Sequence, residues 1–232
     1  MKAAQNALFH KQNLLEIQKT IKKHCPNKKP TEIIAVTKKQ TLDSVSAAIK
    51  NNLMKIGENQ VQEAEKKFEQ QKEIRKKIEL HLIGHLQTNK ANRAVKIFDV
   101  IQTVDSQKIL KKINSAGKKH NKKQRIFFQV NIGKDPQKKG FSVSSLWDIC
   151  KTVGEYQNII VEGLMAILPA GKTKKENKDL FIKTISLQKE IQKQKIKTCL
   201  NTSLGMSGDY VEAVQAGATH IRIGSSLFGT RK

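Results

Sequence analysis

Residues 32–68 read "EIIAVTKKQTLDSVSAAIKNNLMKIGENQVQEAEKKF" and show the repeating pattern of the chain. Two short runs of apolar, largely β-branched residues, at 32–37 and 53–58, are each followed by a segment with helical periodicity. A strand that alternates with a helix predicts βαβ units, and βαβ units build a parallel sheet. The same alternation continues to the end of the chain.

Eight such apolar runs occur, and helical segments separate them. They span residues 32–37, 53–58, 80–85, 99–104, 125–132, 159–167, 198–206 and 220–226. Eight βα units close naturally into a (β/α)8 TIM barrel, and 232 residues fall within the size range of that fold. An open doubly wound sheet is the alternative, but no Gly-x-Gly-x-x-Gly turn follows the first run. We therefore predict an α/β protein with a single (β/α)8 barrel.

The segment before the first run predicts an extra N-terminal helix. Its apolar side comprises Leu8, Leu14, Leu15, Ile17 and Ile21. The segment lacks the apolar core of a signal peptide, and no apolar run in the chain approaches the roughly 20 residues that cross a bilayer. The four prolines are scattered and no Gly/Ser-rich linker occurs, which favours one domain over residues 1–232.

The formal net charge is +24, with aromatic residues at only 5%. A surface that binds nucleic acid gathers its basic residues in a patch, often with aromatic side chains between them. Here the lysines are spread over nearly every helical segment, which is typical of a solvated surface. We expect no specific nucleic-acid partner, although a basic nucleic-acid-binding protein stays an alternative. The charge also favours a monomer, because copies of such a surface repel each other.

The three cysteines, Cys25, Cys150 and Cys199, form no Cys-x-x-Cys pair. Their odd number indicates reduced, structural thiols and a cytoplasmic protein. No cluster of histidine, cysteine or carboxylate residues has the spacing of metal ligands.

The active site of a TIM barrel lies at the C-terminal ends of its strands, so the polar residues just past each run are the candidates. They include Lys38, Asn59, His85, Ser207, Arg222, Gly224 and Ser225. Lys39 is a rival to Lys38, but adjacent residues leave a strand in opposite directions, so only one lysine faces the barrel mouth.

A lysine at a strand end with apolar walls suits covalent chemistry. Desolvation disfavours the ammonium form, and a neutral lysine forms a Schiff base with an aldehyde. The last two strands predict a phosphate site, with Ser207 as the N-cap of a helix and with Gly224 and Ser225 close by. An imine-forming lysine beside a phosphate site suggests pyridoxal 5′-phosphate (PLP). Arg222 faces the same side of its strand as Gly224 and could reach the ring nitrogen, where an arginine would weaken the electron sink.

Several motifs together resemble the pyridoxal phosphate homeostasis protein family, which shares the fold of the alanine racemase N-terminal domain. They are "AVTKK", "IGENQVQE", "LHLIGHLQTNK", "GLMAI", "LGMSGDYVEAVQAGAT" and "IRIGSSLFG", and the resemblance runs from about Leu8 to Gly229. It implies PLP held as a Schiff base on Lys38, a phosphate cup from Ser207, Gly224 and Ser225, Arg222 near the ring nitrogen, and Asn59 and His85 along the mouth. The chain departs from the family at Gln60, which replaces an aromatic residue after "GEN".

The remaining question is whether the protein is an enzyme. A racemase needs two bases, one for each face of the carbanion. In enzymes of the alanine racemase type the second base is a tyrosine from an additional β domain, and this chain ends soon after the eighth run. Its two tyrosines, Tyr156 and Tyr210, are expected away from the mouth.

We expect a non-catalytic PLP-binding protein that acts in intracellular PLP homeostasis, with PLP-dependent enzymes as clients. A PLP-dependent amino-acid racemase of weak activity is the alternative.

Overall fold

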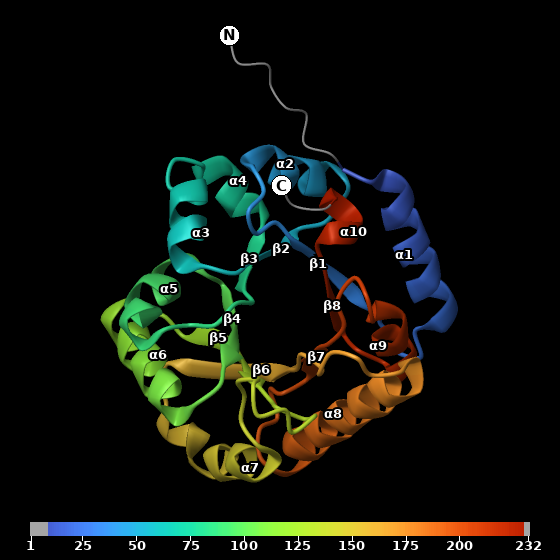
Figure 1. Ribbon diagram of the computed structural model, residues 1–232. Helices are drawn as coiled ribbons and strands as arrows, with labels where there is room; N and C mark the ends of the chain where they lie inside the picture. Colours follow the sequence, from blue (N-terminus) through green and yellow to red (C-terminus); the bar gives the residue numbers. More distant parts are fainter. Residues whose placement is uncertain (1–8, 230–232) are drawn as a thin grey trace.

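The computed structural model describes residues 9–229 and forms a closed barrel of eight parallel strands in the order β1 to β8 (Figure 1). The strands are β1 Glu32–Val36, β2 Lys55–Glu58, β3 Glu79–Leu82, β4 Val100–Val104, β5 Gln124–Gln129, β6 Ile159–Met165, β7 Asn201–Ser203 and β8 His220–Ile223. β1 pairs with both β2 and β8, which closes the sheet. The predicted (β/α)8 barrel is confirmed, and each of the eight apolar runs coincides with one strand, although β3 and β5 each begin one residue before their run.

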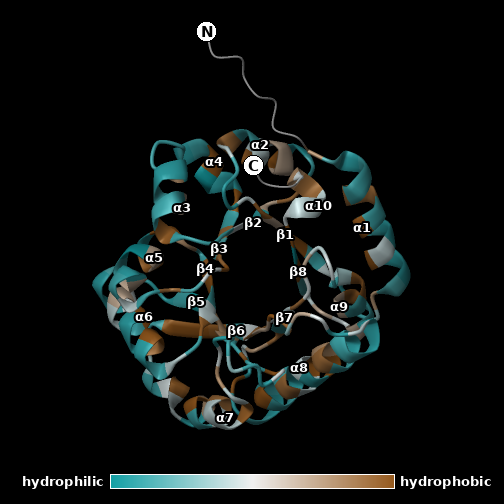
Figure 2. Ribbon diagram, viewed as in Figure 1, coloured by the Kyte–Doolittle hydropathy of each residue, from teal (hydrophilic) through white to brown (hydrophobic). Residues whose placement is uncertain are grey.

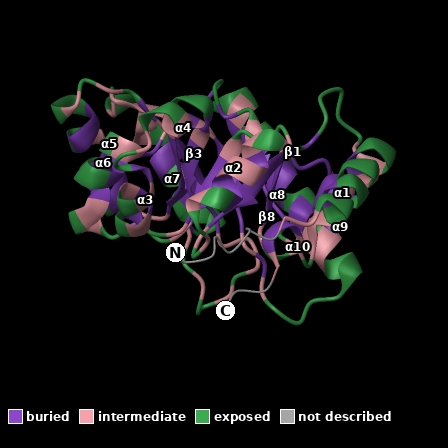
Figure 3. Ribbon diagram, turned by 90° about the horizontal axis from the view of Figure 1, so that it is seen from above, coloured by how far each residue is buried: buried purple, intermediate pink, exposed green. Residues whose placement is uncertain are grey.

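Helices surround the barrel and turn their hydrophilic sides outward (Figure 2). They are α1 Lys11–His24, α2 Leu42–Lys50, α3 Val61–Phe68, α4 Lys72–Lys77, α5 Ala91–Ile97, α6 Gln107–Lys119, α7 Val143–Thr152, α8 Lys174–Gln194, α9 Tyr210–Ala216 and α10 Ser225–Phe228, with short 3-10 turns η1 Thr88–Lys90 and η2 Val153–Glu155. Buried residues concentrate on the strands and on the inner helix faces, while the outer faces are exposed (Figure 3). Among the described helices, none combines the length and apolar character of a membrane span.

The predicted N-terminal helix is present as α1, which packs beside α9 and α10 (Figure 1). Its buried residues are Leu14, Ile17 and Ile21. Leu15 was wrongly assigned to the apolar side, since it is 49% exposed. Leu8 lies outside the described residues. The backbone N–H of His10 donates to the carbonyl of Leu227 at 2.9 Å, which fixes the start of α1 against the last helix.

Two elements differ from the sequence-based expectation. The helical segment between the second and third runs forms two helices, α3 and α4, because the apolar spacing that lets α3 bury Val61, Ala64 and Phe68 does not continue into α4, which buries no residue. The eighth apolar run was expected to be extended to residue 226, yet β8 ends at Ile223 and α10 begins at Ser225.

The interior contains two apolar regions. The large core fills the layer between the strands and the helices. A small cluster of Val100, Phe127 and Met165 forms a separate region of buried apolar side chains. Buried polar side chains on four strands accompany it: His81, Gln102, Ser203 and Arg222. An enclosed polar interior of this kind must satisfy its own hydrogen bonds.

Candidate functional site

A cavity of about 530 Å³ opens at the C-terminal ends of the strands. All seven residues predicted from the sequence line it: Lys38, Asn59, His85, Ser207, Arg222, Gly224 and Ser225. They come from the ends of β1, β2, β3, β7 and β8, so the closed barrel brings together residues that are up to 187 positions apart, from Lys38 to Ser225.

The two adjacent lysines after β1 have different surroundings. Lys38 is half-buried and lines the cavity, whereas Lys39 is exposed and absent from the cavity wall. Lys39 adopts the left-handed backbone conformation, with φ of 57°, and its N–H donates to the carboxylate of Glu63 in α3. This turn directs the two side chains apart, as the strand geometry predicted.

A buried ion pair between Lys67 and Glu58 stabilises the end of β1. Lys67 of α3 donates to the Glu58 carboxylate at 2.6 Å and to the Thr37 carbonyl at 2.8 Å. The Thr37 hydroxyl donates to the same Glu58 oxygen at 2.6 Å. Burial raises the pKa of Glu58, although Lys67 and Thr37 oppose the shift. Since Thr37 immediately precedes Lys38, this cluster fixes the backbone from which the cavity lysine extends.

Arg222 lies at the cavity with its guanidinium fully buried. Its Nη1 donates to the carbonyl and the hydroxyl of Ser203, at 2.6 and 2.8 Å, and its Nη2 donates to the Ala166 carbonyl at 2.9 Å. Burial lowers the pKa of Arg222 to about 10, and Asp209 opposes that shift. The side chain therefore presents a positive group in a fixed orientation.

The turn after β7 meets the turn after β8. The backbone N–H of Ser226 donates to the Ser207 hydroxyl at 3.5 Å, so Ser207 lies against the first turn of α10, which begins at Ser225. The prediction that Ser207 caps a helix was wrong: α9 begins at Tyr210, with Asp209 at its N-cap position. The reason is an intervening turn, in which the Asp209 carboxylate accepts from the N–H of Met206 at 2.6 Å. The Asp209 side chain thus bonds within its own turn, and Asp209 does not line the cavity.

Asn59 and His85 occupy the wall formed by β2 and β3. The strand-end loops are packed closely there, since a Cβ on Gly84 would clash with the backbone carbonyl of Asn59. His85 lies between two charged groups: its Nδ1 is 3.2 Å from the Asp105 carboxylate, and its Nε2 is 2.8 Å from Nζ of Lys139. The imidazole therefore bridges a carboxylate and an amine at the cavity mouth.

Several lining residues were not selected from the sequence. They are Val36, Ile83, Gly84, Thr103, Gln129, Lys138, Lys139, Ile167, Met206 and Gly208. Lys138 and Lys139 come from the loop "GKDPQKKG" after β5, which reaches the mouth because Lys138 donates to the Leu168 carbonyl beyond β6. The unusual basicity of that loop is the signal that could have identified it.

The cavity combines groups with complementary chemistry. A lysine amine can bind an aldehyde covalently, and the hydroxyls of Ser207 and Ser225 can donate to a phosphate. Arg222 can donate to a ring nitrogen or attract an anion. Apolar contacts from Val36, Ile83 and Ile167 suit the faces of a planar ring. The arrangement fits a small phosphorylated carbonyl compound.

Comparisons with known proteins agree with this chemistry. Residues 10–232 match the family model "Alanine racemase, N-terminal domain". The pyridoxal phosphate homeostasis protein of Synechocystis is 34% identical over 86% of this chain and 91% of its own length, and that of Escherichia coli is 30% identical over 87% of each. The structure of PipY from Synechococcus elongatus with PLP bound superposes with a TM-score of 0.81 and 30% identity, covering 92% of this chain and 99% of PipY.

Proposed function

Since the chain belongs to the family of pyridoxal phosphate homeostasis proteins, built on the alanine racemase N-terminal domain fold, we propose that it binds PLP reversibly as a Schiff base on Lys38 and acts in intracellular PLP homeostasis. PLP supplies a reactive aldehyde on an electron-accepting ring. A protein that keeps this aldehyde bound limits its reaction with other amines while holding it ready for use.

One observation carries the proposal: an amine, two hydroxyls and a buried guanidinium meet in one cavity on three neighbouring strands, β1, β8 and β7. Each group has a counterpart in PLP. Lys38 would bind the aldehyde, and Arg222 would face the ring nitrogen. Ser207, Ser225 and the backbone at Gly224 would hold the phosphate. The cavity volume, about 530 Å³, lies within the range of small-molecule sites, ~300–1,000 Å³.

Asn59 and His85 would complete the wall beside the ring, with the Asp105 carboxylate orienting the imidazole. The proposal assigns all these contacts to one PLP-binding domain over residues 1–232. The proposed protein is cytoplasmic and monomeric. A net charge of +24 opposes association between copies. PLP-dependent enzymes would be the recipients of the cofactor.

We favour a carrier over an amino-acid racemase. Racemisation requires a base on each face of the bound amino acid, and neither of the two tyrosines is a lining residue. Tyr156 precedes β6 and its hydroxyl accepts from Gln107 at the start of α6, and Tyr210 begins α9. An arginine at the ring nitrogen also disfavours carbanion formation. The curated relatives carry the name of homeostasis proteins.

The test compares Lys38→Ala with the matched control Lys39→Ala, each titrated with PLP and followed by visible absorbance. Lys39→Ala should bind like the wild-type protein, and Lys38→Ala should lose the imine band. An unchanged band in Lys38→Ala would overturn the site assignment. Turnover of L-alanine by the PLP-loaded wild-type protein at ordinary enzyme rates, ~1–1,000 s⁻¹, would overturn the carrier assignment.

A further inference from the structure

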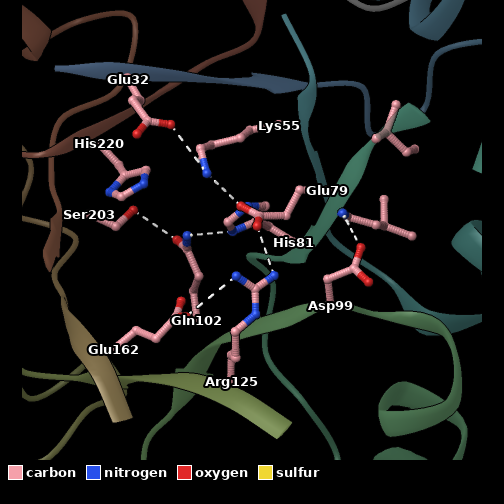
Figure 4. Close-up of polar contacts among 12 residues, drawn as sticks. Glu32, Lys55, Glu79, His81, Asp99, Gln102, Arg125, Glu162, Ser203 and His220 are labelled. Atoms are coloured by element: carbon pink, nitrogen blue, oxygen red, sulfur yellow. Dashed lines mark hydrogen bonds and ion pairs between the residues drawn. The ribbon is translucent and has the colours of Figure 1, made fainter. Parts of the chain in front are cut away.

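A row of buried polar side chains crosses the barrel interior from the cavity towards the opposite end. Beyond Arg222 at the cavity, it consists of Ser203 on β7, Gln102 on β4, and His81 and Glu79 on β3. Ser203, Gln102 and His81 are at most 1% exposed. Figure 4 shows these side chains pointing towards one another from three strands, with dashed lines joining them in sequence.

The hydrogen bonds of this row are continuous. Arg222 Nη1 donates to the Ser203 hydroxyl oxygen at 2.8 Å, and the hydroxyl donates to Gln102 Oε1 at 2.8 Å. Gln102 Nε2 is 3.0 Å from His81 Nδ1, and His81 Nε2 is 2.8 Å from the Glu79 carboxylate. The side chains therefore connect the cavity arginine to a carboxylate at the other end of the barrel.

The chemistry of the two ends fixes the direction of every bond between them. A guanidinium can only donate, and a carboxylate can only accept. Ser203 must accept from Arg222 and donate to Gln102, whose amide then donates to His81 Nδ1. His81 is left with its proton on Nε2, directed at Glu79. Burial lowers the pKa of His81, which keeps Nδ1 available as an acceptor. Aligned bonds of this kind polarise and strengthen one another.

Glu79 is held as an anion at the end of the row. Its carboxylate is 2.6 Å from Lys55 Nζ and 2.7 Å from Arg125 Nη2. Burial alone would raise the pKa of Glu79, but the His81 N–H and these two cations lower it strongly. The row thus begins on a buried cation and ends on a stabilised anion, and neither terminal group can reverse its role.

We propose that Ser203, Gln102 and His81 are positioning residues that hold the Arg222 guanidinium in place at the PLP ring nitrogen. The inference rests on the proposed function, because it concerns the orientation of a cavity residue towards PLP. Gln102 is the decisive member. It does not line the cavity, and no described hydrogen bond joins it to Arg222, yet its amide is the only link between the Ser203 hydroxyl and His81 among the described hydrogen bonds.

The experiment compares Gln102→Met with Gln124→Met in the full-length protein. Gln124 on β5 is as deeply buried as Gln102, and its Nε2 donates to the main-chain carbonyls of Asp99 and Arg125 and to no side chain of the row. Both variants lose a buried amide, so both should be less stable. Only Gln102→Met should weaken PLP affinity, by about two- to tenfold, the value of a hydrogen bond between neutral groups. It should also shift the visible band of the imine, since the charge next to the ring nitrogen moves.

A second measurement needs no cofactor. The ¹⁵N chemical shifts of His81 in the unloaded protein should report the Nε2–H tautomer in the wild type and in both variants, because Glu79 still accepts from Nε2. The Nδ1 resonance should shift only in Gln102→Met, which removes the amide that donates to Nδ1, and an unshifted Nδ1 resonance would refute that bond. A double-mutant cycle of Gln102→Met with Ser203→Ala is the third measurement. Both changes break the same row of hydrogen bonds, so their effects on PLP affinity should be strongly non-additive.

The outcomes separate the two proposals. If borohydride fixes PLP on Lys38 in both methionine variants and their affinities are equal, the positioning role is wrong while the site assignment stands. If the wild-type protein forms no adduct on Lys38, the proposed function itself is wrong. Additive effects of the two changes on PLP affinity would likewise refute the claim that Gln102 and Ser203 act through one row of hydrogen bonds.

Discussion

Replacing Lys67 with methionine should strongly destabilise the protein at neutral pH and much less in mild acid. Methionine preserves the length and the apolar stem of the side chain but removes the ammonium that pairs with Glu58 at 2.6 Å. The Lys67 and Glu58 side chains are 8% and 0% exposed, so little water can replace the lost partner. Breaking a buried pair in this way typically costs about 3–5 kcal/mol of unfolding free energy.

The pH dependence follows from the ability of Glu58 to take up a proton instead. Burial raises the pKa of Glu58 even with its partners present, and the loss of Lys67 raises it further. Protonating a carboxyl of ordinary pKa costs roughly 3.7 kcal/mol at about pH 7 and roughly 1 kcal/mol at about pH 5. The loss of unfolding free energy in Lys67→Met cannot exceed this cost, because Glu58 can become neutral instead of staying an unpaired anion. The folded variant binds more protons than its unfolded chain, so its stability is lost as pH rises.

The assay is urea unfolding at both pH values, with Lys66→Met as the matched control, since Lys66 is the exposed neighbour on α3. The control should behave like the wild-type protein at either pH. The double variant Lys67→Met with Glu58→Gln should recover most of the stability at neutral pH. A Lys67→Met penalty that stays the same at both pH values, or is below about 1 kcal/mol at pH 7, would refute the buried-pair account.

Gly84→Ala should cost about 1–3 kcal/mol in urea unfolding, because the new methyl group would clash with the main-chain carbonyl that follows β2; Gly154→Ala, with open space at its Cβ, should be nearly neutral. Ser225→Asp should weaken binding of PLP about tenfold or more by charge repulsion but hardly affect pyridoxal, which lacks the phosphate; equal losses in a fluorescence titration would remove Ser225 from the phosphate site. Burial raises the pKa of Cys199 to about 12, so iodoacetamide at about pH 8 should alkylate half-buried Cys25 well before Cys199 in the native protein. Peptide mass spectrometry measures the labelling, and equal labelling of the two cysteines would contradict the burial of Cys199.

The sequence was sufficient for the barrel because each strand is a short apolar run bounded by polar residues, and eight such runs leave few alternatives. The ends of the strands were less predictable. The run at 198–206 contains only the three-residue strand β7, since Gly205 then turns the chain with φ of 78°. Local composition does not show where hydrogen bonding to the neighbouring strands stops.

The cavity residues were predictable where they directly follow a strand, as Lys38 and Arg222 illustrate. Lys139 was missed because a long loop returns it to the mouth, where it meets His85. The interior row was missed for a different reason. His81 and Gln102 interrupt apolar runs, and a single polar residue within a strand does not reveal which partner it will meet across a closed sheet.

The most direct test of the central claim is borohydride reduction of the PLP-loaded protein followed by peptide mass spectrometry. Reduction converts an imine into a stable secondary amine, so the modified lysine can be identified in a lysine-rich chain. We predict a pyridoxyl adduct on Lys38 at one equivalent, with the exposed neighbour Lys39 unmodified. Adducts distributed over the surface lysines, or on Lys39 in place of Lys38, would contradict the account.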